Sequence, residues 1–292
     1  MKRVLKPFKY VFLGLALLFL YIPIIYLIVF SFNDFGSGRH INYTNIGTWN
    51  GFTFRNFLTL FNGEAGEALI LTLEIAAISS IVATVIGTAA AIGINAMKKR
   101  SRTVILNFSQ LPMVNPDLVT GITFMMLFAF VNTLLINMGM RHAQINGFVK
   151  LLIAHISFSI PYVIFSVMPR LRQSSDMLYE AAIDLGCTPI QALFKAVIPD
   201  IMPGITSGFI MALTMSLDDF VVSYFVGDKS VLSVYIYSSF RTSGVNPAIA
   251  TVLFVPLVAL LLFVNLRSLA KEREYEIQSK KVKLKDKGGN LK

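Results

Sequence analysis

Charged side chains are scarce in this sequence. Aspartate, glutamate, lysine and arginine make up 14% of its 292 residues, whereas soluble domains carry about 25%. The few charges cluster in short connecting stretches and leave long stretches almost uncharged. This distribution argues against an ordinary soluble domain and indicates a chain whose main solvent is lipid.

Cysteine and histidine are also rare. The single cysteine, Cys187, excludes a disulfide framework within the chain and a cysteine-cluster metal site. The histidines, His40, His142 and His155, stand far apart, and no two of them have the spacing of metal ligands. We therefore expect no metal site and no cofactor in this chain.

Enzyme motifs are missing as well. The phosphate-binding pattern Gly-x-x-x-x-Gly-Lys-Ser/Thr does not occur, so we expect no ATP hydrolysis by this chain. No Ser/His/Asp set or histidine pair falls on one predicted side of the membrane. An intramembrane enzyme is therefore disfavoured, and no catalytic residue is expected.

Long apolar runs are what the sequence does contain. Each is close to or longer than the ~20 residues that a helix needs to cross ~30 Å of hydrocarbon. Unpaired backbone groups are too costly in a bilayer core, so these runs predict helices. We expect an all-α integral membrane protein with six spans, at about 10–32, 69–94, 106–131, 148–169, 202–226 and 247–266.

The first run follows four basic residues, as a signal peptide does. It is too long for one, and no small-x-small cleavage pattern follows it. We interpret it as a retained span. The loop after it, at about 33–68, is rich in aromatic residues, glycine and asparagine, and its stretch 54–61 predicts a short amphipathic helix along the outer surface.

Lysine and arginine predict the orientation. Of the 26, 20 lie at the N-terminus, in 98–102, in 170–200 and in the tail from Arg267. The positive-inside rule places these segments, and hence both termini, in the cytoplasm. The predicted parts are a cytoplasmic N-terminus (1–9), a transmembrane domain (10–268) and a basic cytoplasmic tail (269–292). The tail is expected to meet solvent or lipid headgroups, and no nucleic-acid partner is expected.

The cytoplasmic loop at about 170–200 has the signals of a helical hairpin. Ser175 or Asp176 can cap a helix that runs to Leu185, and Gly186 can end it. Thr188-Pro189 then supplies a cap and a first-turn proline for a second helix.

That second helix is amphipathic, with Ile190, Leu193, Phe194 and Val197 on one side. Periodicity alone leaves two alternatives open. The apolar side packs back on the chain's own membrane helices, or it docks on a partner protein.

A resemblance favours docking. The residues Glu180, Ala181 and Ala182, followed by Gly186, resemble the EAA loop of binding-protein-dependent ABC importer permeases. Pro199 and Pro203 fit the same pattern, whereas Ala196 and Ile198 stand where the family usually has isoleucine and leucine. The resemblance implies a type I importer fold and a coupling helix that inserts into an ATPase subunit. The coupling residues it implies are Glu180, Ala181, Ala182, Asp184, Leu185, Gly186 and Pro199.

Further stretches are similar to the polyamine branch of that family, in particular to the second of its two permease subunits. They are WNGFT at 49–53, LPMVNPD at 111–117, IAH at 153–155, SLDDFVVSYF at 216–225 and VYIYS at 234–238. The resemblance implies a related second permease, two ATPase subunits that bind ATP and magnesium, an external binding protein, and import of spermidine or putrescine.

The acidic residues in or beside the spans support a cationic cargo independently. They are Glu74, Asp117, Asp218 and Asp219, and no lysine or arginine lies well inside a span. Intramembrane charges are costly and usually face a pathway or a partner, so a passing amine can supply the missing counter-charge. Alternatively, Glu74 is hydrated at a helix end and Asp117 caps a broken helix. One of Asp218 and Asp219 must point elsewhere, because adjacent helical residues lie ~100° apart.

Three tyrosines, one histidine and a repeat of small residues are the remaining features to interpret. Tyr224, Tyr235 and Tyr237 either offer cation–π faces to an amine or anchor the chain at the membrane interface. With the aspartates, Tyr224 and Tyr235 form the candidate pathway. His155 is interpreted as a hydrogen-bonded core histidine rather than a proton relay, and the repeat Ala83, Gly87, Ala91 predicts close helix packing.

Three functions compete at this point. The first is a polyamine importer permease, and the second is the same machine with another cargo, such as iron, an opine or an anion. The third is a stand-alone secondary transporter or channel, which would need no ATPase.

Overall fold

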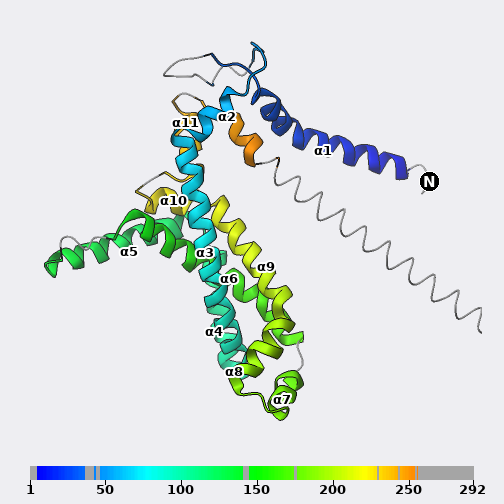
Figure 1. Cartoon of the computed structure of the whole chain (residues 1–292), viewed down its shortest axis with the longest axis vertical. Helices are drawn as coiled ribbons and strands as arrows, with labels where there is room; N and C mark the ends of the chain where they lie inside the picture. The colour runs from blue at the N-terminus through cyan, green and yellow to red at the C-terminus, as the bar shows by residue number, and fades with distance from the viewer. Residues whose placement is uncertain are drawn as a thin grey trace, which may run out of the picture. The chain divides into compact units, whose positions relative to one another are not determined.

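A computed structural model describes residues 5–36, 43, 47–140, 145–173, 176–228, 230–242, 244–253 and 255. Within these residues the regular elements are helices (Figure 1), and one isolated bridge joins Asn33 to Phe52. The chain divides into two compact units, 1–62 with 240–292, and 63–239. Five helical stretches are long and apolar enough to cross a membrane: Val11–Phe30, Glu64–Asn95, Asp117–Asn137, Gly147–Gln173 and Pro189–Asp218.

The first unit contains α1 (Leu5–Phe30) and α2 (Arg55–Phe61). Helix α2 is the short helix predicted in the outer loop, and it starts one residue later than expected. Its Asn56 is buried and donates from Nδ2 to the carbonyl oxygens of Ser31 and Asn33, both at 2.8 Å. Asn246 Nδ2 in turn donates to Asn56 O at 2.8 Å. These buried amides tie α2 to the chain after α1 and to the segment around Asn246.

The second unit is built on three long helices, α3 (Glu64–Asn95), α6 (Gly147–Gln173) and α9 (Ile198–Asp218), which pack side by side (Figure 1). The small-residue repeat on α3 makes this possible, as predicted, because Ala83, Gly87 and Ala91 are all buried. A Cβ atom on Gly87 would lie 2.7 Å from Cβ of Val163 in α6, which is closer than carbon atoms approach. Glycine is therefore required at this crossing.

Two shorter helices contact this three-helix core, and one of them also contacts α5. α4 contacts α3 and α6, and α10 contacts α5 and α6. The bounds of these helices and of α11 are α4 (Lys99–Val114), α5 (Asp117–Asn137), α10 (Val221–Val226) and α11 (Leu232–Phe240).

The predicted third span, 106–131, is wrong in its bounds because the helix breaks inside it. α4 ends at Val114, and the membrane-length helix is α5, which starts at Asp117. Pro116 explains the break, because proline lacks an N–H and disfavours helical backbone at the residue before it. Asn115 accordingly has extended backbone angles, with φ −70° and ψ 134°.

The predicted fifth span, 202–226, also breaks. α9 ends at Asp218, Asp219 is extended with φ −67° and ψ 126°, and α10 begins at Val221. The second and fourth predicted spans fall within α3 and α6. Most of the sixth, 247–266, lies outside the described residues, as does the tail 269–292. The count of six spans, the cytoplasmic termini and the predicted domain boundaries stay predictions.

The predicted helical hairpin is present. α7 (Asp176–Asp184) ends one residue before the expected Leu185, and Gly186 follows with φ +86°, a conformation that favours glycine. Thr188 caps the next helix: its side chain accepts from Gln191 N, and the Gln191 side chain accepts from Thr188 N. Ser175, one of the two expected caps of the first helix, lies outside the described residues.

The second helix of the hairpin continues into a stretch long and apolar enough to cross a membrane. It consists of α8 (Pro189–Ala192), the π-helical turn η1 (Leu193–Val197) and α9, without a break. One continuous helical path therefore runs from the hairpin to Asp218.

Candidate substrate cavity and coupling hairpin

The two helix breaks line one cavity of about 260 Å³. The α4–α5 side contributes Asp117 and Thr120, and the α9–α10 side contributes Asp218 and Asp219. The third wall is α6, which supplies aromatic side chains. Three of the four acidic residues singled out in the sequence thus meet, although Asp117 and Asp218 are about a hundred residues apart. Glu74 is exposed on α3 and does not line this cavity.

The cavity carries negative charge without a matching base. Asp117 and Asp218 are exposed in this chain, and no lysine or arginine occurs among the described residues that line the cavity. A concave site of one charge sign with apolar walls attracts counter-ions. Asp117 is the first residue of α5, where the helix dipole favours a carboxylate. The alternative in which Asp117 caps a broken helix agrees with the structure on the break, but the N-cap position itself belongs to Pro116.

Asp219 behaves differently from its neighbour. Its Oδ1 accepts from Val222 N at 3.2 Å and its Oδ2 from Ser223 N at 2.8 Å, which satisfies free amides at the start of α10. Its Oδ2 also lies 3.6 Å from His155 Nε2, and its side chain is only 9% exposed. Asp219 is therefore the member of the pair that turns to neighbouring helices, and the cause is the break of the helix at this residue rather than helical spacing.

His155 lies at the centre of a buried hydrogen-bond network. Its Nδ1 is 2.6 Å from Ser216 Oγ, and its Nε2 is 3.1 Å from Ser223 Oγ. Ser216 Oγ lies a further 3.1 Å from Ser79 Oγ. The network joins α3, α6, α9 and α10, and both ring nitrogens have partners. The interpretation of His155 as a hydrogen-bonded core residue is confirmed.

An aromatic cluster adjoins the acidic cavity through Phe220, which lines it. The Phe220 ring centre lies 5.6 Å from that of Tyr224 and 5.2 Å from that of Tyr237, and the two tyrosines are 6.2 Å apart. Tyr224 thus stands beside the cavity, as the candidate pathway requires. Tyr235 lies on the same helix as Tyr237. It does not line the acidic cavity, and it takes no part in the described ring contacts.

Sequence reasoning gave no pathway role to several lining residues, notably Thr120, Phe158, Tyr162 and Phe220. Helical spacing was the available signal for three of them. Thr120 follows Asp117 by three residues, and Tyr162 follows Phe158 by four, so each pair shares a helix face. The sequence alone does not show that these helices lie close enough to line one cavity.

Most of the predicted coupling residues lie on α7 and the turn after it, and Pro199 lies further along, in α9. Glu180, Ala181 and Asp184 are exposed on α7, Ala182 is half-buried, and Pro199 is exposed near the start of α9.

Large apolar side chains extend from the hairpin. Leu185 is 86% exposed, Ile190 70% and Phe194 62%. The described part of the chain therefore leaves these three side chains uncovered, which is the property that docking on a partner requires.

Comparison with known proteins identifies the family. Residues 83–273 match the model of the binding-protein-dependent transport system inner membrane component. The chain belongs to this family. It is accordingly a multi-pass membrane permease component of an ABC transport system, and it works with other subunits.

Two similar relatives are polyamine permeases by name. The spermidine/putrescine transport system permease protein PotC of Haemophilus influenzae is 33% identical over 261 residues, which cover 87% of this chain and 94% of the relative. The putrescine transport system permease protein PotI of Escherichia coli is 32% identical over 286 residues, covering 94% and 95%.

A solved structure has the same fold. It is the crystal structure of a bacterial ABC transporter involved in the import of the acidic polysaccharide alginate. The matched chain has a TM-score of 0.60 and 21% identity, and the match covers 90% of this chain and 97% of that chain. At this identity the likeness concerns the fold alone, which is that of an ABC importer permease.

Proposed function

We propose that this chain is a permease subunit that passes polyamines, spermidine or putrescine, into the cytoplasm in an ATP-driven importer. It acts with a related second permease, two ATPase subunits that bind ATP and magnesium, and an external binding protein. The observation that carries the cargo assignment is the cavity in which Asp117, Asp218 and Asp219 meet. The named cargo of PotC and PotI supports it.

The charge of the cavity discriminates between cargoes. A protonated amine forms charge-assisted hydrogen bonds with carboxylates, which are stronger than neutral ones. An anion would meet carboxylates without a basic partner among the described lining residues. The aromatic rings of Phe220 and Tyr224 add faces to which an ammonium group is attracted. Iron and opines stay as alternative cargoes, and the uptake measurement below separates them from amines.

The energy enters through the hairpin. The exposed side chains of Leu185, Ile190 and Phe194 dock in a groove of the ATPase, and closure of the two ATPases on ATP moves the hairpin. Because α8, η1 and α9 form one helical path, this displacement reaches Asp218 at the cavity. Net transport needs two states with different affinity for cargo, and ATP binding biases them. Without its ATPase this chain is expected not to transport, in contrast to a stand-alone transporter.

The cargo is tested by Asp117→Asn and Asp218→Asn. Uptake of radiolabelled putrescine and spermidine is measured in cells that carry the complete transporter. We expect a loss of about tenfold or more for each variant, because a hydrogen bond to a charged group contributes about 1.5–3 kcal/mol.

The matched control is Glu67→Gln, which removes an exposed acid of α3 away from the cavity. It should leave uptake unchanged, and all three proteins should assemble with the ATPase equally. Full amine uptake by both aspartate variants would show that the cavity is not the cargo site. Uptake of iron or an opine, but of no amine, by the unaltered complex would overturn the polyamine assignment.

A further inference from the structure

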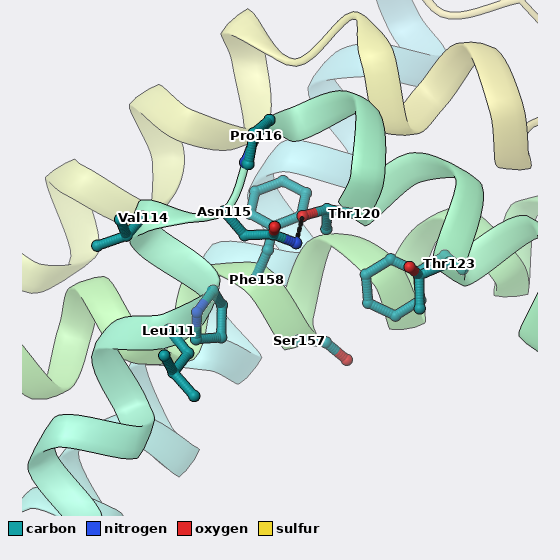
Figure 2. A pocket seen from close by; sticks show the side chains of 10 residues that line it. Leu111, Val114, Asn115, Pro116, Thr120, Thr123, Ser157 and Phe158 are labelled. Carbon is teal, nitrogen blue, oxygen red and sulfur yellow. Dashed lines mark hydrogen bonds between the residues drawn. The ribbon is translucent and has the colours of Figure 1, made fainter.

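A second, larger cavity of about 580 Å³ adjoins the acidic one. We call it the apolar groove. It shares Pro112, Thr120 and Phe158 with the acidic cavity, so the two spaces have a common wall. Figure 2 shows Leu111 and Val114 of α4 on one side and Thr123 of α5 on the other. The remaining lining residues are Asn115, Pro116, Phe124 and Ser157.

The groove is uncharged. Asn115 Nδ2 donates to Thr120 Oγ1 at 3.3 Å (Figure 2), and two further hydroxyl groups of the lining are arranged as acceptors. Thr123 Oγ1 donates to Val119 O and Ser157 Oγ to Ile153 O, both at 2.7 Å, so each hydroxyl hydrogen is already used within its own helix. The oxygen lone pairs remain available to a hydrogen-bond donor. The groove therefore offers apolar walls together with acceptors, which suits an alkyl chain that ends in an N–H group.

The polar residues of the two lining sets are spaced along α5. Asp117, Thr120 and Thr123 follow one another at intervals of three residues, and the rise of a helix places Thr123 about 9 Å from Asp117 along the axis. All three line one or the other space. A single ammonium group cannot contact both ends of this row. Two ammonium groups joined by an aliphatic spacer can.

We propose that the apolar groove is a subsite for the distal half of a diamine. One ammonium group sits on Asp117 and Asp218, the methylene spacer lies against Pro112 and Phe158, and the second ammonium group donates to Thr123 and Ser157. This inference rests on the proposed function, and it adds a basis for selecting diamines over monoamines. An acyl chain of lipid would gain nothing from the hydroxyl acceptors or from the adjoining carboxylates.

The test compares binding of 1,4-diaminobutane and 1-aminobutane to the purified complex of both permeases and the ATPases, without the external binding protein. The unaltered complex is expected to prefer the diamine. Thr123→Val keeps the shape and removes the acceptor, and it should reduce the preference by about fivefold, the order expected for one lost hydrogen bond. Thr123→Leu narrows the groove and should reduce the preference for the diamine at least as much.

Thr133 supplies the matched control. It is also an exposed threonine of α5 whose Oγ1 donates one turn back, to Ala129 O at 2.9 Å, and it lines neither cavity. Thr133→Val should leave the preference unchanged.

Three results would overturn the groove assignment: equal affinity of the unaltered complex for the two amines, a preference that survives both Thr123 variants, or an equal loss in Thr133→Val. If the unaltered complex binds neither amine, the groove assignment is wrong, whereas the cargo assignment is decided separately by the uptake measurement.

Discussion

At the scale of single residues, two adjacent aspartates have different surroundings. Asp218 is exposed and lines the acidic cavity, whereas Asp219 accepts two backbone amides and faces His155. The charge of Asp219 is therefore held by protein groups, and that of Asp218 is left for a ligand. Because both residues have the same side chain, only their hydrogen-bond partners distinguish them.

His155 is predicted to stabilise this arrangement. His155→Phe keeps the size of the ring but leaves Ser216, Ser223 and Asp219 without its nitrogen atoms. Buried polar groups that lose a partner cost about 1–3 kcal/mol each. We expect a lower thermal unfolding temperature of the purified complex, and partial recovery in His155→Gln, which restores hydrogen-bonding atoms.

Ser159 provides the control one turn further along α6. It is fully buried, and its Oγ has no hydrogen-bond partner in the part of the chain that the structure describes. Ser159→Ala should therefore be neutral or stabilising. An unfolding temperature that is equal for His155→Phe and Ser159→Ala would show that the network contributes nothing to stability.

At the scale of elements, turns and helix ends that depend on local sequence could be predicted, whereas those that depend on contacts between helices could not. The hairpin was predicted to within a residue because Gly186, Thr188 and Pro189 act on their own backbone. The helix break before Asp117 was raised from Pro116 only as an alternative, and the predicted third span was drawn across it because the apolar run continues through it. The break at Asp219 depends on amides of α10 and on His155, and these contacts exist only once the chain has folded.

The hairpin turn is predicted to be essential for coupling. Gly186→Ala places a side chain at φ +86°, which costs about 1–2 kcal/mol and distorts the turn between α7 and α8. We expect the ATPase to co-purify with this variant in clearly reduced amount.

Gly139, at the end of α5, is the matched control. Its φ is +81°, and at both glycines an added Cβ would meet no atom within 4 Å, so the local strain is the same. Gly139→Ala should retain the ATPase. Stoichiometric ATPase on a Gly186→Pro, Glu180→Lys double variant would contradict docking through this hairpin.

At the scale of the whole molecule, the proposed mechanism depends on the side of the membrane that the hairpin faces. The charge distribution predicts the cytoplasm, and the helical path from Pro189 to Asp218 then joins the cytoplasmic face to the acidic cavity. If the hairpin faced outward, no ATPase could reach Leu185 or Phe194.

The only cysteine of the chain permits a direct measurement of that side. Cys187 lies in the turn between α7 and α8, its thiol is free, and it is half-buried. A membrane-impermeant maleimide should label it in inside-out vesicles and leave it unlabelled in intact spheroplasts. Asn62→Cys in a Cys187→Ser background reports on the predicted outer loop and should show the reverse pattern. Labelling of Cys187 from outside would place the hairpin away from ATP, so the proposed route of energy through α9 would be impossible.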